Sequence, residues 1–347
     1  VMRWELRTRL FLRTSEFLWQ EGHTAHATAE EAEAETLQML GVYRKFMEEW
    51  VAMPPITGIK SESEKVAGAV RTHGCEALMQ DNKALQAGTS HFLGQNFARQ
   101  FDLKFQSEAG QEEYAWNTSW GVSTRMVGGM VMTHGDDVGI IVPPRLAPTQ
   151  VVIVPISRKE EERVAVKEKA EELAGLLRDS GVRVKVDARD HLSPGAKFWE
   201  WERKGVPFRL EIGPKDLAKE QAVLVRRTTF GEEQRKEFLP QREAVEGMVS
   251  RLDTFQANLL AAARERREAN SHRGVQDMTT LKEIIDGPGG FVYTGWSGDP
   301  AVEEMVKEQT KATIRVIPDA EFRSDTAPTK CIGGGDAKME VVWSKAY

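Results

Sequence analysis

The stretch from Val151 to Arg227 constrains the fold most, because it alternates between strand and helix patterns. A continuous apolar run, Val151 to Ile156, is followed by a charged amphipathic segment over Lys159 to Asp179 and by alternating valines over Val182 to Val186. Gly181 stands where a glycine typically ends a helix. Strand, helix and strand in this order predict a right-handed crossover and parallel pairing. The stretch therefore predicts a compact α/β domain.

The regions on either side follow other patterns. Residues 1–147 mix extended stretches, one long helix and glycine-rich segments, whereas residues 239–347 open with a long charged helix that reaches Asn270. We therefore expect three domains, with the α/β domain at residues 148–238 and a small α+β domain after it. Two further strands complete the α/β domain: Phe208 to Ile212 and Gln221 to Arg227.

Four elements are expected early in residues 1–147. Alternating charged and apolar residues predict strands at Val1 to Arg7 and at Phe17 to Glu21. A capping-box spacing opens a helix over residues 28–50, and a short helix is expected at Cys75 to Met79. Because the sequence opens on Val in the middle of a strand pattern, we expect further residues upstream.

Composition excludes several classes of protein. The 347 residues are 40% hydrophobic, and 47 Lys and Arg against 53 Asp and Glu give a net charge of −6. The apolar runs fall far short of the ~20 residues of a membrane span, so we expect no membrane partner. Two distant cysteines argue against a disulfide framework and favour a reducing compartment, which predicts a cytoplasmic protein.

The first charged segment has the chemistry of an anion site. Arg3, Glu5 and Arg13 lie among aromatic residues. Unpaired charges are costly to bury, and arginine binds phosphate or carboxylate through two parallel hydrogen bonds. A surface ladder of ion pairs explains the same residues without a ligand and stays open at this point. We expect no metal at His23 and His26, because this spacing in an extended segment puts the two rings on opposite faces.

Four long strings are specific enough to compare with known families. They are Arg3 to Glu5 with Phe11 to His23, Gln86 to Phe97, Ser119 to Arg125 with Met132 to Asp137, and Lys204 to Asp216. In this order they resemble motif 2, the proline-pocket segment, motif 3 and the anticodon-binding domain of class II prolyl-tRNA synthetases. The resemblance implies part of a class II antiparallel-sheet catalytic domain at residues 1–147, an α/β anticodon-binding domain at 148–238 and a small α+β C-terminal domain at 239–347.

The resemblance also implies an activity, which is the attachment of L-proline to tRNA(Pro) through a prolyl-adenylate made from proline and ATP with Mg²⁺. The catalytic residues would be Arg3, Arg13 and Arg125. The ATP-binding residues would be Arg3, Glu5, Arg13, Thr14, Phe17, Gln86, Thr89, Ser123 and Arg125, with Phe17 and Arg125 on the two faces of adenine. The proline-binding residues would be Arg3, Trp19, Glu21, His91, Trp120 and Gly121.

For the RNA, the matching positions are Phe198, Glu202, Arg209 and Lys215. An aromatic ring can stack on an unstacked base, a carboxylate can accept from a guanine edge, and cations suit phosphate. An ordinary α/β surface is the alternative for these residues. The net charge does not oppose RNA binding, because basic residues cluster locally at Arg183, Lys185, Arg189, Lys197, Arg203, Lys204, Arg226 and Arg227.

The sequence departs from the family pattern at several places. Only Cys331 remains of a four-cysteine zinc site, where Ser297, Val302 and Gly334 occupy the other positions, so we expect no structural zinc. The interval between motifs 2 and 3 has no room for an editing insertion, which resembles the archaeal and eukaryotic-like branch. Motif 1, which builds the dimer interface, is not in the chain, so we expect a homodimer formed through a missing N-terminal part. A truncated, non-catalytic tRNA-binding or regulatory paralogue is the alternative, and a structural scaffold in a synthetase assembly is a third class.

Overall fold

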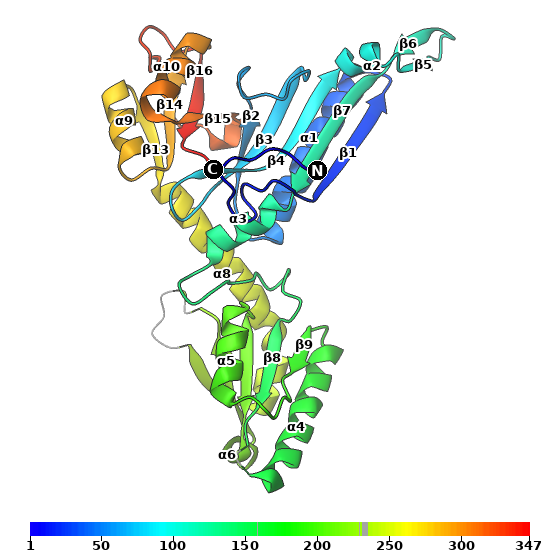
Figure 1. Ribbon diagram of the computed structural model, residues 1–347, viewed down its shortest axis with the longest axis vertical. Coiled ribbons are helices and arrows are strands. Elements are labelled where there is room, and N and C mark those ends of the chain that lie inside the picture. Colours follow the sequence, from blue (N-terminus) through cyan, green and yellow to red (C-terminus); the bar gives the residue numbers. More distant parts are fainter. Residues whose placement is uncertain (158, 229, 231–234) are drawn as a thin grey trace. The chain divides into compact units, whose positions relative to one another are not determined.

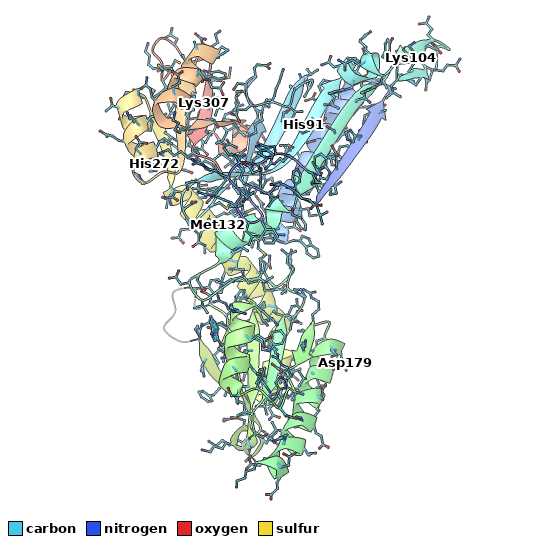
Figure 2. All side chains as sticks on the ribbon, in the orientation of Figure 1. His91, Lys104, Met132, Asp179, His272 and Lys307 are labelled. Carbon is cyan, nitrogen blue, oxygen red and sulfur yellow. The ribbon has the colours of Figure 1, made fainter. Side chains whose placement is uncertain are left out.

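The computed structural model describes residues 1–157, 159–228, 230 and 235–347, which form two compact units (Figure 1; Figure 2 adds the side chains). The first unit comprises residues 1–49, 53–133 and 263–347, and the second comprises residues 50–52 and 134–262. In sequence, the second unit is therefore inserted into the first. No helix in the described part of the chain is long and apolar enough to span a bilayer.

The first unit is built on an antiparallel sheet with the order β1-β7-β4-β3-β2 (Figure 1). The strands are β1 (Trp19–His26), β2 (Ile56–Ile59), β3 (Arg71–Leu78), β4 (Ala84–Gly94) and β7 (Trp116–Ser123). Shorter elements at its edges and ends are α2 (Asn96–Gln100), β5 (Lys104–Gln106), β6 (Glu112–Tyr114) and α3 (Arg125–His134). The large antiparallel sheet expected for residues 1–147 is confirmed.

Helix α1 (Ala29–Glu49) covers one face of this sheet. One bond of its predicted capping box forms, since the Glu31 N–H donates to Thr28 Oγ1 (3.2 Å), while Glu31 Oε2 accepts from the N–H of Ala27, the residue before Thr28 (3.2 Å). The buried positions recur at helical spacing: Ala32, Thr36, Leu40, Tyr43 and Met47. The helix packs through this stripe, which explains the apolar period read from the sequence.

The same sheet continues into the C-terminal region through β15-β16-β14-β13, so nine strands form one sheet. These strands are β13 (Ser271–Val275), β14 (Phe291–Trp296), β15 (Thr313–Pro318) and β16 (Met339–Ser344), with helices α9 (Met278–Asp286), α10 (Pro300–Thr310) and η1 (Ala320–Phe322). Strand β2 pairs antiparallel with β15. A Cβ at Gly58 would lie 2.2 Å from the Ile317 carbonyl oxygen, so this close pairing requires glycine.

The second unit has a five-stranded sheet, β12-β11-β10-β8-β9. Its elements are β8 (Val151–Pro155), α4 (Glu160–Asp179), β9 (Val184–Val186), α5 (Pro194–Arg203), β10 (Phe208–Ile212), α6 (Pro214–Leu217), β11 (Gln221–Arg226), β12 (Lys236–Pro240), α7 (Gln241–Glu246) and the first part of α8 (Met248–Ala269). Strands β9, β8 and β10 are parallel, which confirms the crossover predicted from the strand and helix patterns. Strands β11 and β12 add antiparallel to β10.

Three predictions of secondary structure need correction. Residues 1–7 form no strand. Met2 makes one isolated antiparallel bridge to Glu16, and the first strand of the described chain begins at Trp19. Cys75 to Met79 is not a helix, since most of it belongs to β3, where burial on both faces leaves no period to read. The helix expected from Pro240 to Asn270 breaks at Gly247 into α7 and α8.

Candidate active site

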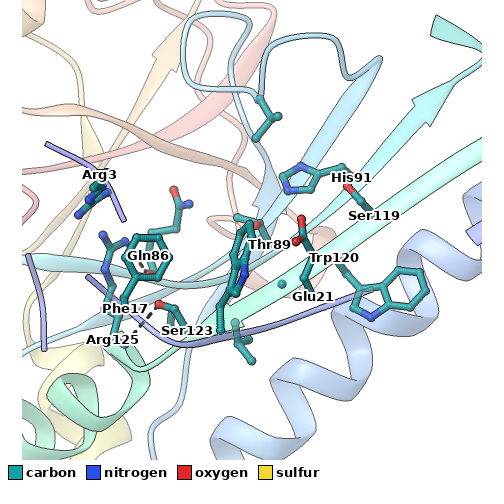
Figure 3. Close-up of a pocket in the computed structure, with 16 residues that line it drawn as sticks. Arg3, Phe17, Glu21, Gln86, Thr89, His91, Ser119, Trp120, Ser123 and Arg125 are labelled. Atoms are coloured by element: carbon teal, nitrogen blue, oxygen red, sulfur yellow. Dashed lines mark hydrogen bonds between the residues drawn. The ribbon is translucent and has the colours of Figure 1, made fainter. Parts of the chain in front are cut away.

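The first unit holds a cavity of about 340 Å³ on one face of its sheet (Figure 3). Side chains alternate along the strands, and Gln20 and Ser90 point toward helix α1, where they bond Tyr43 Oη (2.6 Å) and the Thr36 carbonyl (2.7 Å). The alternate positions therefore face away from the helix. They include Glu21, Thr89, His91, Ser119 and Ser123, and all of these line the cavity.

One end of the cavity, which we call the arginine end, gathers Arg3, Phe17, Gln86, Ser123 and Arg125 (Figure 3). The Arg3 guanidinium lies 5.3 Å from the centre of the Phe17 ring. Arg125 is held by backbone acceptors, because its Nε donates to Leu12 O (3.1 Å) and its Nη1 to Gln86 O (3.3 Å). The aromatic and guanidinium faces of this end suit a flat ring with an attached anion.

The arginine end carries excess positive charge. Arg3 and Arg13 share one carboxylate, with their nitrogens 3.4 and 3.9 Å from Glu5 Oε2. Burial lowers the pKa of Arg125, and the charges of Arg13 and Arg3 lower it further. Two guanidinium groups share one carboxylate and a third, that of Arg125, donates to backbone carbonyls, which favours an anionic ligand.

Three expected ATP-binding residues lie next to the arginine end without lining the cavity: Glu5, Arg13 and Thr14. The Thr14 carbonyl accepts from Arg3 Nε (3.3 Å), and Glu5 pairs with both arginines. Arg13 Nη2 donates to the Tyr347 carbonyl oxygen, and the Tyr347 hydroxyl donates to Asp81. Arg13 therefore contacts Glu5 through Nη1 and Tyr347 through Nη2.

The other end of the cavity, the histidine end, contains Glu21, His91 and Ser119 (Figure 3). His91 is buried, which lowers its pKa to about 4, so its ring is neutral near pH 7. Its Nδ1 lies 3.0 Å from Thr72 Oγ1, which also accepts from the Val66 N–H (3.2 Å). A buried neutral ring beside a carboxylate suits a small ligand with an ammonium group and an apolar body.

Trp19, Trp120 and Gly121 also line the cavity. A Cβ at Gly22 would lie 2.5 Å from the Trp120 indole, and Gly22 shares its face of the sheet with Gln20. The Trp120 ring therefore lies on the face of helix α1, and its indole points away from Glu21 and His91 in Figure 3. Trp120 thus lines the cavity with its ring turned toward helix α1, and its contact with proline stays a prediction.

In the second unit, two of the expected anticodon residues meet. The Arg209 guanidinium lies 4.2 Å from the centre of the Phe198 ring, and its Nε donates to Glu211 Oε1 (2.9 Å). Glu202 pairs with Arg235. Lys215 is exposed on α6, beyond the end of β10.

Two members of the expected basic cluster are not available for RNA. Arg227 is buried and pairs with Asp136, with Nη1 2.8 Å from Oδ2. Lys197 is also buried, and its Nζ donates to the Asp187 carbonyl (3.0 Å). The sequence shows how many cations lie in this stretch, but only the fold shows which of them serve structure.

Metal-ligating residues do not gather in the described part of the chain, where no group of three or more His, Cys, Asp or Glu could hold an ion. His23 pairs with Glu21 (3.2 Å) and His26 with Thr24 Oγ1 (2.7 Å), so the two rings lie on opposite faces as predicted. Cys331 is buried with a free thiol. The absence of structural zinc stays a prediction.

Val66 lines the cavity although no feature of the sequence singled it out. It follows β2 in an irregular segment and reaches the histidine end only through its bond to Thr72. Its position depends on tertiary contacts, so no local pattern could have identified it.

Comparisons with known proteins agree with this geometry. Residues 150–250 match the family model described as "Anticodon binding domain", and residues 278–347 match "Prolyl-tRNA synthetase, C-terminal". An anticodon-binding domain in one chain with an antiparallel sheet and an arginine-rich cavity defines an aminoacyl-tRNA synthetase.

The particular synthetase follows from its relatives. The chain is 52% identical to the proline–tRNA ligase of Salinibacter ruber and 51% identical to that of Chlorobium phaeobacteroides, covering 100% of itself and 69% and 72% of theirs. A crystal structure of prolyl-tRNA synthetase from Cryptosporidium parvum, complexed with L-proline and AMP, matches with a TM-score of 0.90 and 36% identity, over 100% of this chain and 73% of that one. The chain belongs to the prolyl-tRNA synthetase family.

Proposed function

We propose that this chain is the part of a proline–tRNA ligase that binds ATP and proline and reads tRNA(Pro). The observation that carries the proposal is the shared cavity, whose arginine end suits a nucleotide and whose histidine end suits an amino acid. Family membership and the solved relative with proline and AMP support the same substrates.

In the first step, a proline carboxylate oxygen forms a bond to the α-phosphorus of ATP, and the bond to the departing pyrophosphate breaks. We assign Arg3 to the charge that develops between the two anions, because it lies at the arginine end beside Phe17. Phe17 and Arg125 would hold adenine, with Ser123, Gln86 and Thr89 around the nucleotide. Glu5, Arg13 and Thr14 would keep Arg3 in place and meet the outer phosphates.

Proline itself would occupy the histidine end. Glu21 faces the cavity and can accept from the ammonium group, while His91, which is buried, Trp19, which is exposed, Trp120 and Gly121 would border the ring. In the second step, a terminal ribose hydroxyl of tRNA(Pro) attacks the prolyl carbonyl carbon, and AMP leaves. Phe198, Glu202, Arg209 and Lys215 are proposed to contact the anticodon, with Phe198 already backed by Arg209.

Mg²⁺ would come with the phosphates of ATP. The described residues offer no cage of three or more ionisable ligands, which agrees with an ion held chiefly by substrate oxygens. When bound, the ion supplies neutralisation of phosphate charge. Gln86 and Thr89 are the proposed neighbours of the ion, because both line the cavity at the arginine end or next to it.

Finer assignments are also proposals. We propose the archaeal and eukaryotic-like branch, a cytoplasmic homodimer that includes residues upstream of Val1, and domains at 1–147, 148–238 and 239–347. The match to a eukaryotic structure supports the branch. Without an editing domain, alanine would be rejected by only ~1 to 3 kcal/mol per missing methylene.

Proline-dependent ATP–pyrophosphate exchange, followed by charging of tRNA(Pro), tests the function. Exchange that requires proline, with alanine as a weaker substrate, is the expected result. Binding of tRNA(Pro) without any exchange would instead support the non-catalytic paralogue.

A further inference from the structure

A segment of the first unit, residues 60–66, forms part of the wall of the histidine end. Both of its ends depend on Thr72, since the Lys60 N–H donates to Thr72 O (2.8 Å) and the Val66 N–H donates to Thr72 Oγ1 (3.2 Å). The same hydroxyl lies 3.0 Å from His91 Nδ1, and Val66 lines the cavity. The position of this segment therefore affects the place where we propose that proline binds.

The middle of the segment is held by the C-terminal region. The Ser61 and Ser63 hydroxyls donate to Glu303 of α10 at 2.8 and 2.7 Å, and both bonds end on the same oxygen, Oε1. Glu303 is buried, with 5% of its surface exposed. A buried carboxylate oxygen that accepts two hydrogen bonds from one segment holds that segment in place.

The start of the segment is held by a buried charged cluster of Lys60, Glu76 and Arg315. Lys60 Nζ donates to Glu76 and to the Arg315 carbonyl (2.7 Å), and Arg315 donates through Nε and Nη2 to the two Glu76 oxygens (3.0 Å each). Their side chains are 1%, 0% and 6% exposed. Burial opposes ionisation of Glu76, yet the two cations lower its pKa, so the cluster is ionic.

Such a cluster does more to define position than to add stability. Desolvation of buried ions cancels much of their attraction, whereas the geometry of the ions is demanding. Glu76 also pairs across β3 and β4 with Gln86, whose carbonyl accepts from Arg125. Glu76 thus connects the cluster to Gln86 at the arginine end, and Lys60 connects it to the segment that reaches the histidine end.

We propose that Glu303 and Arg315 are positioning residues, through which the C-terminal region holds segment 60–66 against the histidine end and sets the affinity for the amino acid. The inference rests on the proposed function, because it assigns the histidine end to proline. Neither residue touches the cavity, so both act through the segment and through Glu76.

Three variants at neighbouring positions test this inference in the exchange reaction. Glu303→Ala should raise the KM for proline about tenfold and leave the KM for ATP within about twofold, since the wall of the histidine end moves. Glu303→Gln should restore the KM for proline, because one amide oxygen can accept from both serines. Glu304→Ala is the matched control, since Glu304 is exposed and pairs only along its own helix with Lys307 (3.4 Å).

Hydrogen exchange of residues 60–66 separates this inference from the proposed function. Glu303→Ala should expose these amides, whereas Glu304→Ala should not, whether or not the wild-type chain is active. Unchanged protection in Glu303→Ala, or equal rises in the KM values for proline and ATP that Glu303→Gln does not repair, would overturn the inference. If Glu303→Ala fails to fold, Ser63→Ala removes one of the two bonds from the exposed side and should raise the KM for proline about threefold; an unchanged KM there would count equally against it.

Discussion

The arginines of the cavity and those of the anticodon-binding unit are neutralised in different ways. Arg3 and Arg13 share the single carboxylate of Glu5, and Arg125 donates to backbone carbonyls. In the other unit, buried Arg227 donates through Nη1 and Nη2 to the two carboxylate oxygens of Asp136, at 2.8 and 2.6 Å. An arginine whose charge the protein neutralises only in part can bind an anionic ligand. An arginine that is fully paired with a carboxylate contributes to the fold instead.

The comparison also separates two kinds of loss on mutation. Substitution of a cavity arginine should lower activity with little loss of stability, because the proposed partner of that arginine is the substrate. Substitution of a buried, paired arginine or of its carboxylate partner should lower stability, because it leaves the other charge buried and unpaired. The first two of the four predictions below test this division between activity and stability. The other two test the proposed RNA contact and the neutral state of the histidine end.

The largest effect is expected at Arg3. Arg3→Ala should lower kcat/KM for proline-dependent exchange by about 10²- to 10³-fold, which corresponds to the loss of one preorganised electrostatic group. The free energy of unfolding should change by less than about 0.5 kcal/mol, since the side chain is partly exposed. Arg7→Ala on the same segment serves as the control, and near-normal exchange in Arg3→Ala would remove Arg3 from the site.

The opposite result is expected at Asp136. Asp136→Ala should lower the free energy of unfolding by about 2 kcal/mol in a urea titration, because the Arg227 side chain is 1% exposed and keeps only carbonyl acceptors. Exchange at saturating substrate should persist. Asp137→Ala, at the exposed neighbouring position, provides the control, and equal stability of the two variants would contradict a structural role for the pair.

A smaller effect is expected at Phe198. Phe198→Ala should raise the KM for tRNA in charging about tenfold through loss of base stacking, while exchange without tRNA stays normal. Trp199→Ala replaces a neighbouring exposed aromatic ring and is the matched control. A defect in exchange would show that Phe198 serves the fold of the chain and not the RNA.

The most gradual change, which builds up over several pH units, concerns the neutral histidine end. The pKa of His91 is about 4 in the folded chain, below its ordinary value of 6.5, so the unfolded chain binds more protons between these limits. Stability should fall as the pH drops from about 6.5 to about 4, by about 1 kcal/mol per pH unit at most, and be flat for this group above pH 7. Urea titrations of wild type and His91→Gln measure the difference, and parallel curves would show that His91 is not buried neutral.

Local signals predicted much of this fold. The α/β unit was predicted from strand and helix periods, and α1 from its capping box, because these features depend on nearby residues. The prediction at Cys75 to Met79 was wrong because β3 is buried on both faces and shows no alternation. Charge alternation predicts a strand at the start of the chain, but the pairing there stops at a single bridge between Met2 and Glu16, and alternation alone does not show how far a pairing extends.

The residues of the candidate site were also predictable only in part. Motif strings brought Arg3, Phe17, Gln86, His91 and Arg125 into one expected cavity, and the structure places them together. Trp120 also lines the cavity, but a motif names a residue without its side of the sheet, so the direction of its ring toward helix α1 could not be predicted. The bonds of Glu76 and Glu303 could not be predicted, since a buried carboxylate requires a cation or donor but sequence does not say which one.

The pairing of β2 with β15 has a consequence for how the protein is made. Arg315 follows Lys60 by 255 positions, so β2 remains an uncovered sheet edge while the whole second unit is synthesised. Closing so long a loop is slow compared with local folding. The histidine end of the cavity is therefore completed only after the second unit has been synthesised, and a chain that ends before α10 lacks the contacts that hold residues 60–66.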